Sequence, residues 1–143
     1  MANNNIIGTW RLVSYFYIDK NGETGYPLGP NPKGYITYTE DGYMSVSMSA
    51  SDRPNRSTDD LLDGTDEEKI AEAATYISYC GKYDLYDDRV VHKIEVALFP
   101  NRVGTSQTRY YKFEDDKVIL TTPPISIHNM PQVCTIVWER AEN

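Results

Sequence analysis

The amino-acid sequence predicts an all-β protein in which about 8–10 antiparallel strands and one short helix form a sandwich or a barrel. The first observation is a series of short segments with alternating apolar and polar residues, which is typical of half-buried strands. The second is tight-turn chemistry between them, as in Asp19-Lys20-Asn21-Gly22 and Glu40-Asp41-Gly42. The third is length, because 143 residues suit a single domain over residues 1–143. This number of strands favours a closed barrel that is wide enough for a small ligand.

The expected strands follow one another with mostly short connections. On the first strand, Trp10, Leu12, Ser14 and Phe16 share one face. The Pro/Gly-rich connection at residues 26–32 interrupts the pattern, because proline cannot donate a hydrogen bond within a central strand. The expected strands cover residues 8–18, 34–39, 43–49, 76–85, 89–99, 104–114, 117–122 and 132–140.

One short helix is expected in the polar segment before residue 76. Thr65-Asp66-Glu67-Glu68 has the pattern of a capping box, in which Thr65 caps the helix and Glu68 reaches back to it. The helix would end near Ala74, with Ile70, Ala73 and Ala74 on its apolar side. We expect it to cover one end of the barrel or a sheet edge. Residues 51–75 would then act either as a lid or as edge protection.

The segment from Val90 to Phe99 places a histidine on an apolar face. Alternation puts His92 on the same side as Val90, Ile94, Val96 and Leu98, whereas Lys93 and Glu95 face water. A buried imidazole needs a hydrogen-bond partner, because an unsatisfied polar group is costly in an apolar interior. His92 is therefore either a core residue satisfied by a tyrosine hydroxyl or part of a ligand or catalytic site.

The neighbouring strands add further polar groups to the same interior. Gln107, Arg109 and Tyr111 share one face of the strand that follows, and Tyr79 and Tyr83 share one face of the strand before. A softer opposite wall is expected from Tyr38, Met44 and Met48. Burial of Arg109 without a counter-charge would be expensive. Apart from Glu139 near the barrel end, no carboxylate lies on the expected inner faces, so Arg109 either reaches water or awaits an anionic or carbonyl ligand.

These residues support three hypotheses about function. As an enzyme, the protein would use Arg109 with Tyr79 or Tyr83 to stabilise a developing oxyanion, and His92 to move a proton during a cofactor-free isomerisation, cyclisation or addition. As a carrier or sensor, it would use the same cavity to bind a small hydrophobic carbonyl or carboxylate compound unchanged. As an interaction protein, it would have a filled barrel. The predicted catalytic residues are His92, Arg109 and Tyr79, and the predicted ligand-binding residues are Tyr83, Gln107, Tyr38, Met44, Met48 and Tyr111.

Composition and motifs narrow the partners. The formal net charge of −7 argues against nucleic acid and against anionic membrane surfaces. No apolar run approaches the length of a membrane span, and Met1-Ala2-Asn3-Asn4-Asn5 does not resemble a signal peptide, so a cytoplasmic protein is expected. Cys80 and Cys134 fall on different sides of their strands, which favours free thiols. No metal-ligand spacing or nucleotide-binding motif is present, so neither a metal nor a cofactor is expected. Exposed strand edges leave a homodimer open.

An ordered set of short motifs resembles the lipocalin-like domain family of bacteria and fungi over nearly the whole chain. The motifs are Gly8-Thr9-Trp10-Arg11-Leu12-Val13-Ser14, Pro27-Leu28-Gly29, Gly34-Tyr35-Ile36-Thr37-Tyr38, Asp41-Gly42-Tyr43-Met44-Ser45, Tyr79-Cys80-Gly81-Lys82-Tyr83, Val91-His92, Gly104-Thr105-Ser106-Gln107-Thr108-Arg109 and Trp138-Glu139-Arg140.

The resemblance implies an antiparallel lipocalin-like β-barrel of the calycin type with a central cavity. Gly8-x-Trp10 resembles the lipocalin signature, in which the tryptophan plugs the closed end of the barrel. It also implies that Arg140, near the end of the last strand, packs over Trp10 as a cation–π contact. The resemblance also implies a role in a small-molecule or secondary-metabolite pathway. Related barrels include both carriers and cyclases or isomerases. The fold therefore leaves the choice of function to the site.

Overall fold

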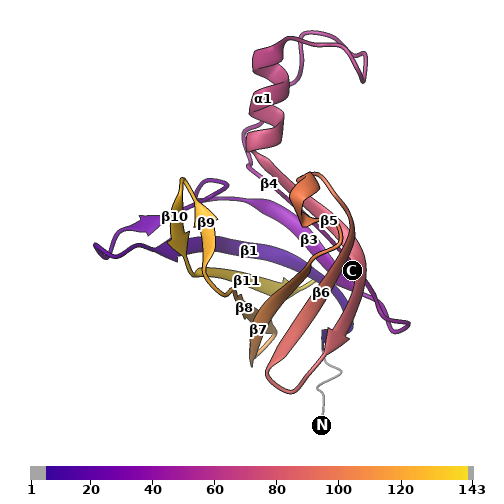
Figure 1. Ribbon diagram of the computed structural model, residues 1–143, viewed down its shortest axis with the longest axis vertical. Helices are drawn as coiled ribbons and strands as arrows, with labels where there is room; N and C mark the ends of the chain where they lie inside the picture. Colours follow the sequence, from indigo (N-terminus) through magenta and orange to yellow (C-terminus); the bar gives the residue numbers. More distant parts are fainter. Residues whose placement is uncertain (1–5, 142–143) are drawn as a thin grey trace.

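Eight antiparallel strands close into a barrel, as expected (Figure 1). The computed structural model describes residues 6–141, so the segment Met1-Ala2-Asn3-Asn4-Asn5, which does not resemble a signal peptide, lies outside the described residues. Around the ring the barrel strands follow one another in chain order, and the last strand closes the barrel by pairing with the first. The barrel strands are β1 (Gly8–Ile18), β3 (Lys33–Tyr38), β4 (Tyr43–Ser49), β5 (Tyr76–Leu85), β6 (Arg89–Ala97), β7 (Ser106–Glu114), β8 (Lys117–Thr121) and β11 (Cys134–Arg140).

Smaller elements decorate the barrel. β2 (Thr24–Gly25) pairs with the end of β1, while β9 (Ile125–Ile127) and β10 (Met130–Gln132) form a separate two-stranded sheet. The sequence pattern did not predict these strands, because two or three residues are too few to show an alternation. The 3₁₀ turn η2 (Pro100–Arg102) follows β6, and the helix α1 (Asp66–Ala74) precedes β5.

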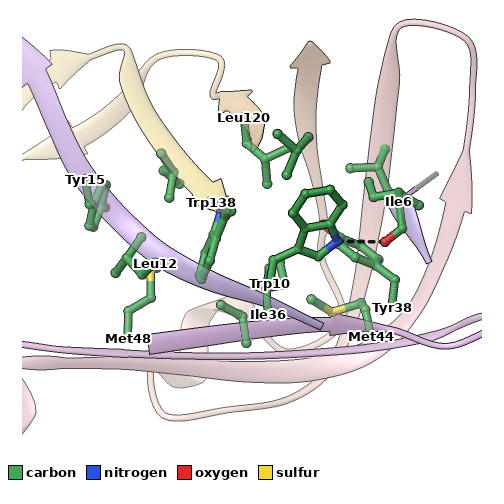
Figure 2. Packing of buried hydrophobic residues seen from close by; sticks show 14 of the residues in the cluster. Ile6, Trp10, Leu12, Tyr15, Ile36, Tyr38, Met44, Met48, Leu120 and Trp138 are labelled. Carbon is green, nitrogen blue, oxygen red and sulfur yellow. Dashed lines mark hydrogen bonds between the residues drawn. The ribbon is translucent and has the colours of Figure 1, made fainter. Parts of the chain in front are cut away.

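A tryptophan and an arginine close one end of the barrel. Trp10 is buried, and its Nε1 donates a hydrogen bond of 2.8 Å to the carbonyl oxygen of Ile6 (Figure 2). The guanidinium carbon of Arg140 lies 3.9 Å from the centroid of the Trp10 ring, which confirms the cation–π contact implied by the resemblance. Nη1 of Arg140 also donates to the carbonyl oxygen of Ile7 at 2.7 Å. These contacts tie the last strand to the start of the chain.

A β-bulge in β1 changes which aromatic side chain enters the barrel. Leu12 lies opposite Trp138 and Ser14 opposite Val137, so Val13 is an extra residue in the ladder. The extra residue reverses the alternation, and Tyr15 is buried while Phe16 is not. The expectation that Phe16 shares a face with Trp10 and Leu12 was therefore wrong.

A second bulge, in β6, corrects the expected face of Val96. Ile94 lies opposite Gly81 and Val96 opposite Cys80, so Glu95 is the extra residue. Val90, His92 and Ile94 are buried as expected, but Val96 is 63% exposed. The bulge also explains the glycine, since a Cβ at Gly81 would lie only 2.0 Å from the carbonyl oxygen of Lys93.

The helix α1 forms where the capping box predicts it. Oγ1 of Thr65 accepts a hydrogen bond from the backbone N–H of Glu68 at 3.1 Å, and Oε1 of Glu68 accepts one from the backbone N–H of Thr65 at 2.9 Å. The helix projects beyond the end of the barrel (Figure 1), and none of its residues is buried. Ile70, expected on an apolar side, is instead 68% exposed. The helix stands beside the open end, and movement of residues 51–75 as a lid stays a prediction.

Candidate ligand-binding site

The barrel encloses a cavity of about 440 Å³. α1, the η2 turn and β9 border its open end through Ala73, Arg102 and Ile125. A barrel filled by its own side chains predicts no such space, so this alternative loses its support. The walls are mostly aliphatic and aromatic, with Ile36, Val46, Met48, Ile77, Ala97, Leu98, Phe99, Leu120, Ile136 and Trp138 among the lining residues.

His92 joins two tyrosines in a buried hydrogen-bond chain. Its Nε2 lies 2.7 Å from the hydroxyl oxygen of Tyr38, and its Nδ1 lies 2.8 Å from the hydroxyl oxygen of Tyr79. The imidazole is 1% exposed. Burial, reinforced by the nearby charge of Arg109, holds the pKa of His92 well below its usual value, so the ring is neutral at physiological pH. The sequence-based alternative of a core histidine satisfied by tyrosine hydroxyls therefore describes its geometry.

Arg109 is a buried cation without an acidic partner in the described part of the chain. Its side chain lines the cavity and the residue is 8% exposed. Nη1 donates to the carbonyl oxygen of Thr108 at 2.8 Å. Burial raises the pKa of the Tyr79 hydroxyl, and the nearby charge of Arg109 opposes that rise. None of the ion pairs found among residues 6–141 includes Arg109. A charge in this position is costly unless something inside the cavity compensates for it.

Sequence reasoning missed two polar groups at the cavity wall. Tyr15 enters the cavity only because of the bulge at Val13, and burial raises its pKa far above the usual value. Trp138 also lines the cavity, and its Nε1 is the one buried side-chain nitrogen or oxygen among the described residues that has no hydrogen-bond partner. The inward alternation of the last strand could have suggested Trp138, whereas no sequence signal marks the bulge at Val13.

The cavity gathers some of the predicted site residues and leaves others behind its walls. Alternation placed His92, Arg109, Tyr79 and Met48 inward, and all four line the cavity. Tyr38 stands behind His92 and reaches the site only through its hydrogen bond. Their roles in binding or catalysis stay predictions.

The other predicted ligand-binding residues do not line the cavity. The hydroxyl of Tyr83 donates to the carbonyl oxygen of Thr39 at 2.6 Å, and its ring packs edge-on against Tyr38. Met44 lies in the packed core near Trp10 and Tyr38 (Figure 2). Gln107 donates to Thr105 at 3.0 Å, and Tyr111 donates to the carbonyl oxygen of Tyr86. A direct ligand contact by these four residues is a prediction that their positions do not favour.

Residues 6–141 contain neither a cluster of metal-ligating side chains nor a helix that could span a membrane. In that range, no group of three or more His, Cys, Asp or Glu side chains lies close enough to hold a metal ion. No helix in the same range is long and apolar enough to cross a membrane. Cys80 and Cys134 are free thiols, half-buried and buried respectively.

Comparison with known proteins places this barrel in a family. The model of the lipocalin-like domain family matches residues 7–141. The chain belongs to the lipocalin-like domain family. One relative is the 4'-hydroxy-3'-methoxypropiophenone carrier protein ppsC of Aspergillus oryzae, which is 28% identical over 106 residues, covering 68% of this chain and 96% of the relative. The barrel, its cavity and these similarities together suggest a domain that binds a small molecule.

Proposed function

We propose that this lipocalin-like domain binds a small hydrophobic molecule with a carbonyl or carboxylate group and carries it unchanged. The observation that carries this proposal is Arg109, a buried cation that faces an apolar cavity and has no acidic partner among residues 6–141. An oxygen with negative or partly negative charge on the ligand would supply the missing partner.

The size and lining of the cavity support a small ligand. Its volume of about 440 Å³ lies in the range of roughly 300–1,000 Å³ that is common for small-molecule sites. Apolar walls would supply affinity through the hydrophobic effect, and a few polar groups would fix the orientation. Arg109 and the Tyr79 hydroxyl are two of the polar groups that can donate to a ligand oxygen.

The carrier relative suggests the first compounds to test. Its name describes an aryl ketone that also bears a hydroxyl and a methoxy group. Such a molecule combines an apolar ring with hydrogen-bond acceptors, which suits the wall chemistry described above. We therefore propose aryl ketones and aryl carboxylates as the ligand class.

Catalysis is a second candidate because of the Tyr79–His92–Tyr38 chain. Tyr79 could pass a proton between a ligand and His92, and Arg109 could stabilise an oxyanion, giving a cofactor-free isomerisation or cyclisation. Two features favour the carrier role over this one. Both ring nitrogens are already occupied by hydroxyls, and the lowered pKa makes His92 a weak base at neutral pH.

Thermal unfolding with a panel of compounds tests the proposal. Aryl ketones and aryl carboxylates are compared with hydrocarbons of the same size that lack oxygen. A ligand at about 100 times its Kd stabilises the folded state by about 2.7 kcal/mol, which for this size of protein raises Tm by roughly 5–10 °C. We expect that rise only with the oxygen-bearing compounds.

Liquid chromatography with mass spectrometry of each mixture then separates the two candidates, because an isomer changes retention without a change in mass. Recovery of unchanged compound is the result expected of a carrier, whereas a new product would favour catalysis. Equal stabilisation by the matched hydrocarbons would contradict a role for Arg109 and Tyr79 in recognition.

A further inference from the structure

We infer that the cavity takes its ligand as an anion, an aryl phenolate or carboxylate whose charge pairs with Arg109. This inference rests on the proposed function, because it names the charge state of the ligand in the same cavity. It also adds a consequence that binding alone does not require, namely that the protein makes its ligand a stronger acid.

The charged side chains that line the cavity all carry positive charge. They are Arg109 in the wall and Arg102 at the open end, where its guanidinium carbon lies 5.3 Å from the centroid of the Phe99 ring. Both charges act on the hydroxyl of Tyr79. No Asp or Glu from the described residues lines the cavity, although the whole chain has a net charge of −7. The cavity is therefore a positive site inside an acidic protein.

The neutral groups around Arg109 do not supply a counter-charge. Burial raises the pKa values of three tyrosine hydroxyls, on Tyr15 of β1, Tyr38 of β3 and Tyr79 of β5. Burial also raises the pKa of the Cys134 thiol on β11. All four groups keep their protons at physiological pH, and His92 of β6 is neutral. Neighbouring β8 presents Leu120 and the connection after it Thr122, neither of which is ionisable.

The proton count of the hydrogen-bond chain directs one donor into the cavity. Tyr38, neutral His92 and Tyr79 carry three exchangeable protons, but only two hydrogen bonds join them. Tyr38 is buried outside the cavity lining, so its proton is used on Nε2 of His92. Nδ1–H then donates to the oxygen of Tyr79. The hydroxyl proton of Tyr79 is left for a ligand acceptor.

Trp138 carries one more donor without a partner, next to the cavity. Its Nε1–H is buried, has no hydrogen-bond partner and belongs to a residue that lines the cavity. An ionised oxygen accepts hydrogen bonds without needing an acceptor for a proton of its own, whereas a phenol or carboxylic acid brings an additional donor. Arg109 and Tyr79 therefore match the anion better than the neutral acid, and the Trp138 N–H would add a third donor if its ring turned toward the ligand.

A pH titration of a bound chromophore tests this inference. The probe is 4'-hydroxy-3'-methoxypropiophenone at a protein concentration that saturates it, with its phenolate measured by ultraviolet absorbance. We expect the pKa of the bound probe to lie at least one unit below that of the free probe in the same buffer, which corresponds to about tenfold tighter binding of the phenolate than of the phenol. The 4'-O-methyl ether, which has no acidic proton, should bind at least about tenfold more weakly than the phenolate, with a Kd that does not change over the same pH range.

Three variants assign the effect to a residue. Arg109→Met should return the pKa of the bound probe to the free value or above it, and Arg109→Lys should keep part of the shift because it keeps the charge. Arg11→Met is the matched control, since Arg11 pairs with Glu139 on the outer surface, and it should behave as the wild type. Arg109→Met should unfold at a Tm no lower than the wild type, because it removes an uncompensated buried charge.

The outcomes separate this inference from the proposed function. A bound probe that titrates at or above its free pKa, or a methyl ether that binds as tightly as the phenolate, overturns the anion inference and leaves the carrier proposal standing. If the protein binds none of the three compounds (the ketone, its ether and 4-hydroxy-3-methoxybenzoate), both the anion inference and the carrier proposal are overturned. Of the two anions, the one with the lower Kd identifies whether the natural acid is a phenol or a carboxylic acid.

Discussion

The side chain of His92 shows how a polar residue can be buried at the wall of a ligand cavity. Alternation on β6 predicted its inward position, and the tyrosine hydroxyls satisfy both of its nitrogens. The neutral imidazole needs no counter-ion, whereas the buried charge of Arg109 does. At the residue scale, we therefore propose different roles for the two groups: His92 orients Tyr79, and Arg109 offers its charge to the ligand.

The lowered pKa of His92 predicts how stability depends on pH. In the unfolded chain His92 takes up a proton near its ordinary pKa of about 6.5, while the folded protein resists protonation until much lower pH. The free energy of unfolding should therefore fall as pH is lowered from about 6.5 to 5, with a slope approaching about 1.4 kcal/mol per pH unit. Urea unfolding at several pH values measures this slope.

Substitution of each histidine assigns the slope. His92→Gln should largely remove it, whereas His128→Gln should keep it, because His128 is exposed in the β9–β10 turn. The chosen range lies above the ordinary pKa values of carboxyl groups, which limits their contribution. The comparison depends on slopes, so a uniform loss of stability in a variant does not affect it. Equal slopes in the wild type and His92→Gln would show that His92 is protonated as readily in the folded chain.

At the scale of single strands, regular alternation could be read from the sequence and bulges could not. β5 and β7 are regular where they carry Tyr79 and Arg109, so their side chains enter the cavity as predicted. Beyond each of the extra residues Val13 and Glu95, the alternation of inward and outward side chains is reversed. As a result, Tyr15 points inward in place of Phe16, and Val96 points outward. A bulge depends on pairing with a distant strand, and local composition carries no record of that partner.

The helix α1 is predicted to open independently of the barrel. None of its residues is buried, and it is held by its capping box and by the paired hydrogen bonds of Arg56 to Glu72, both at 2.7 Å. Hydrogen exchange should therefore be faster in α1 than in β5 and β6, because local unfolding exposes its amides without disturbing the core. Glu72→Gln should speed exchange in residues 66–74 and leave the barrel strands unchanged.

Glu67→Gln is the control for this experiment, since Glu67 is an exposed residue of the first helical turn outside the Arg56 pair. If α1 exchanged as slowly as β5, the helix and barrel would unfold as one unit, contrary to this account. If an aryl ketone that binds the protein slows hydrogen exchange in α1, this would support the prediction that residues 51–75 act as a lid.

The whole molecule divides into a closed end for stability and an open end for binding. Trp10 and Arg140 join the first and last barrel strands at the closed end. Arg102, Ala73 and Ile125 border the open end, and Arg109 lies in the cavity wall. Family motifs in the sequence predicted the barrel and its closed end, because these depend on local strands and on a conspicuous tryptophan. The shape of the cavity depends on two bulges and on short elements that alternation does not reveal.

The most direct test of a ligand in this cavity is nuclear magnetic resonance of the two tryptophan indole N–H groups. Trp138 lines the cavity and its buried Nε1–H has no partner, whereas Trp10 Nε1–H is already bonded to Ile6 at the closed end, so Trp10 is an internal control. During titration with 4'-hydroxy-3'-methoxypropiophenone, we predict a saturable shift of the Trp138 resonance and an unchanged Trp10 resonance. Saturable binding that leaves the Trp138 resonance in place, or no binding, would contradict the assignment of this cavity as the binding site.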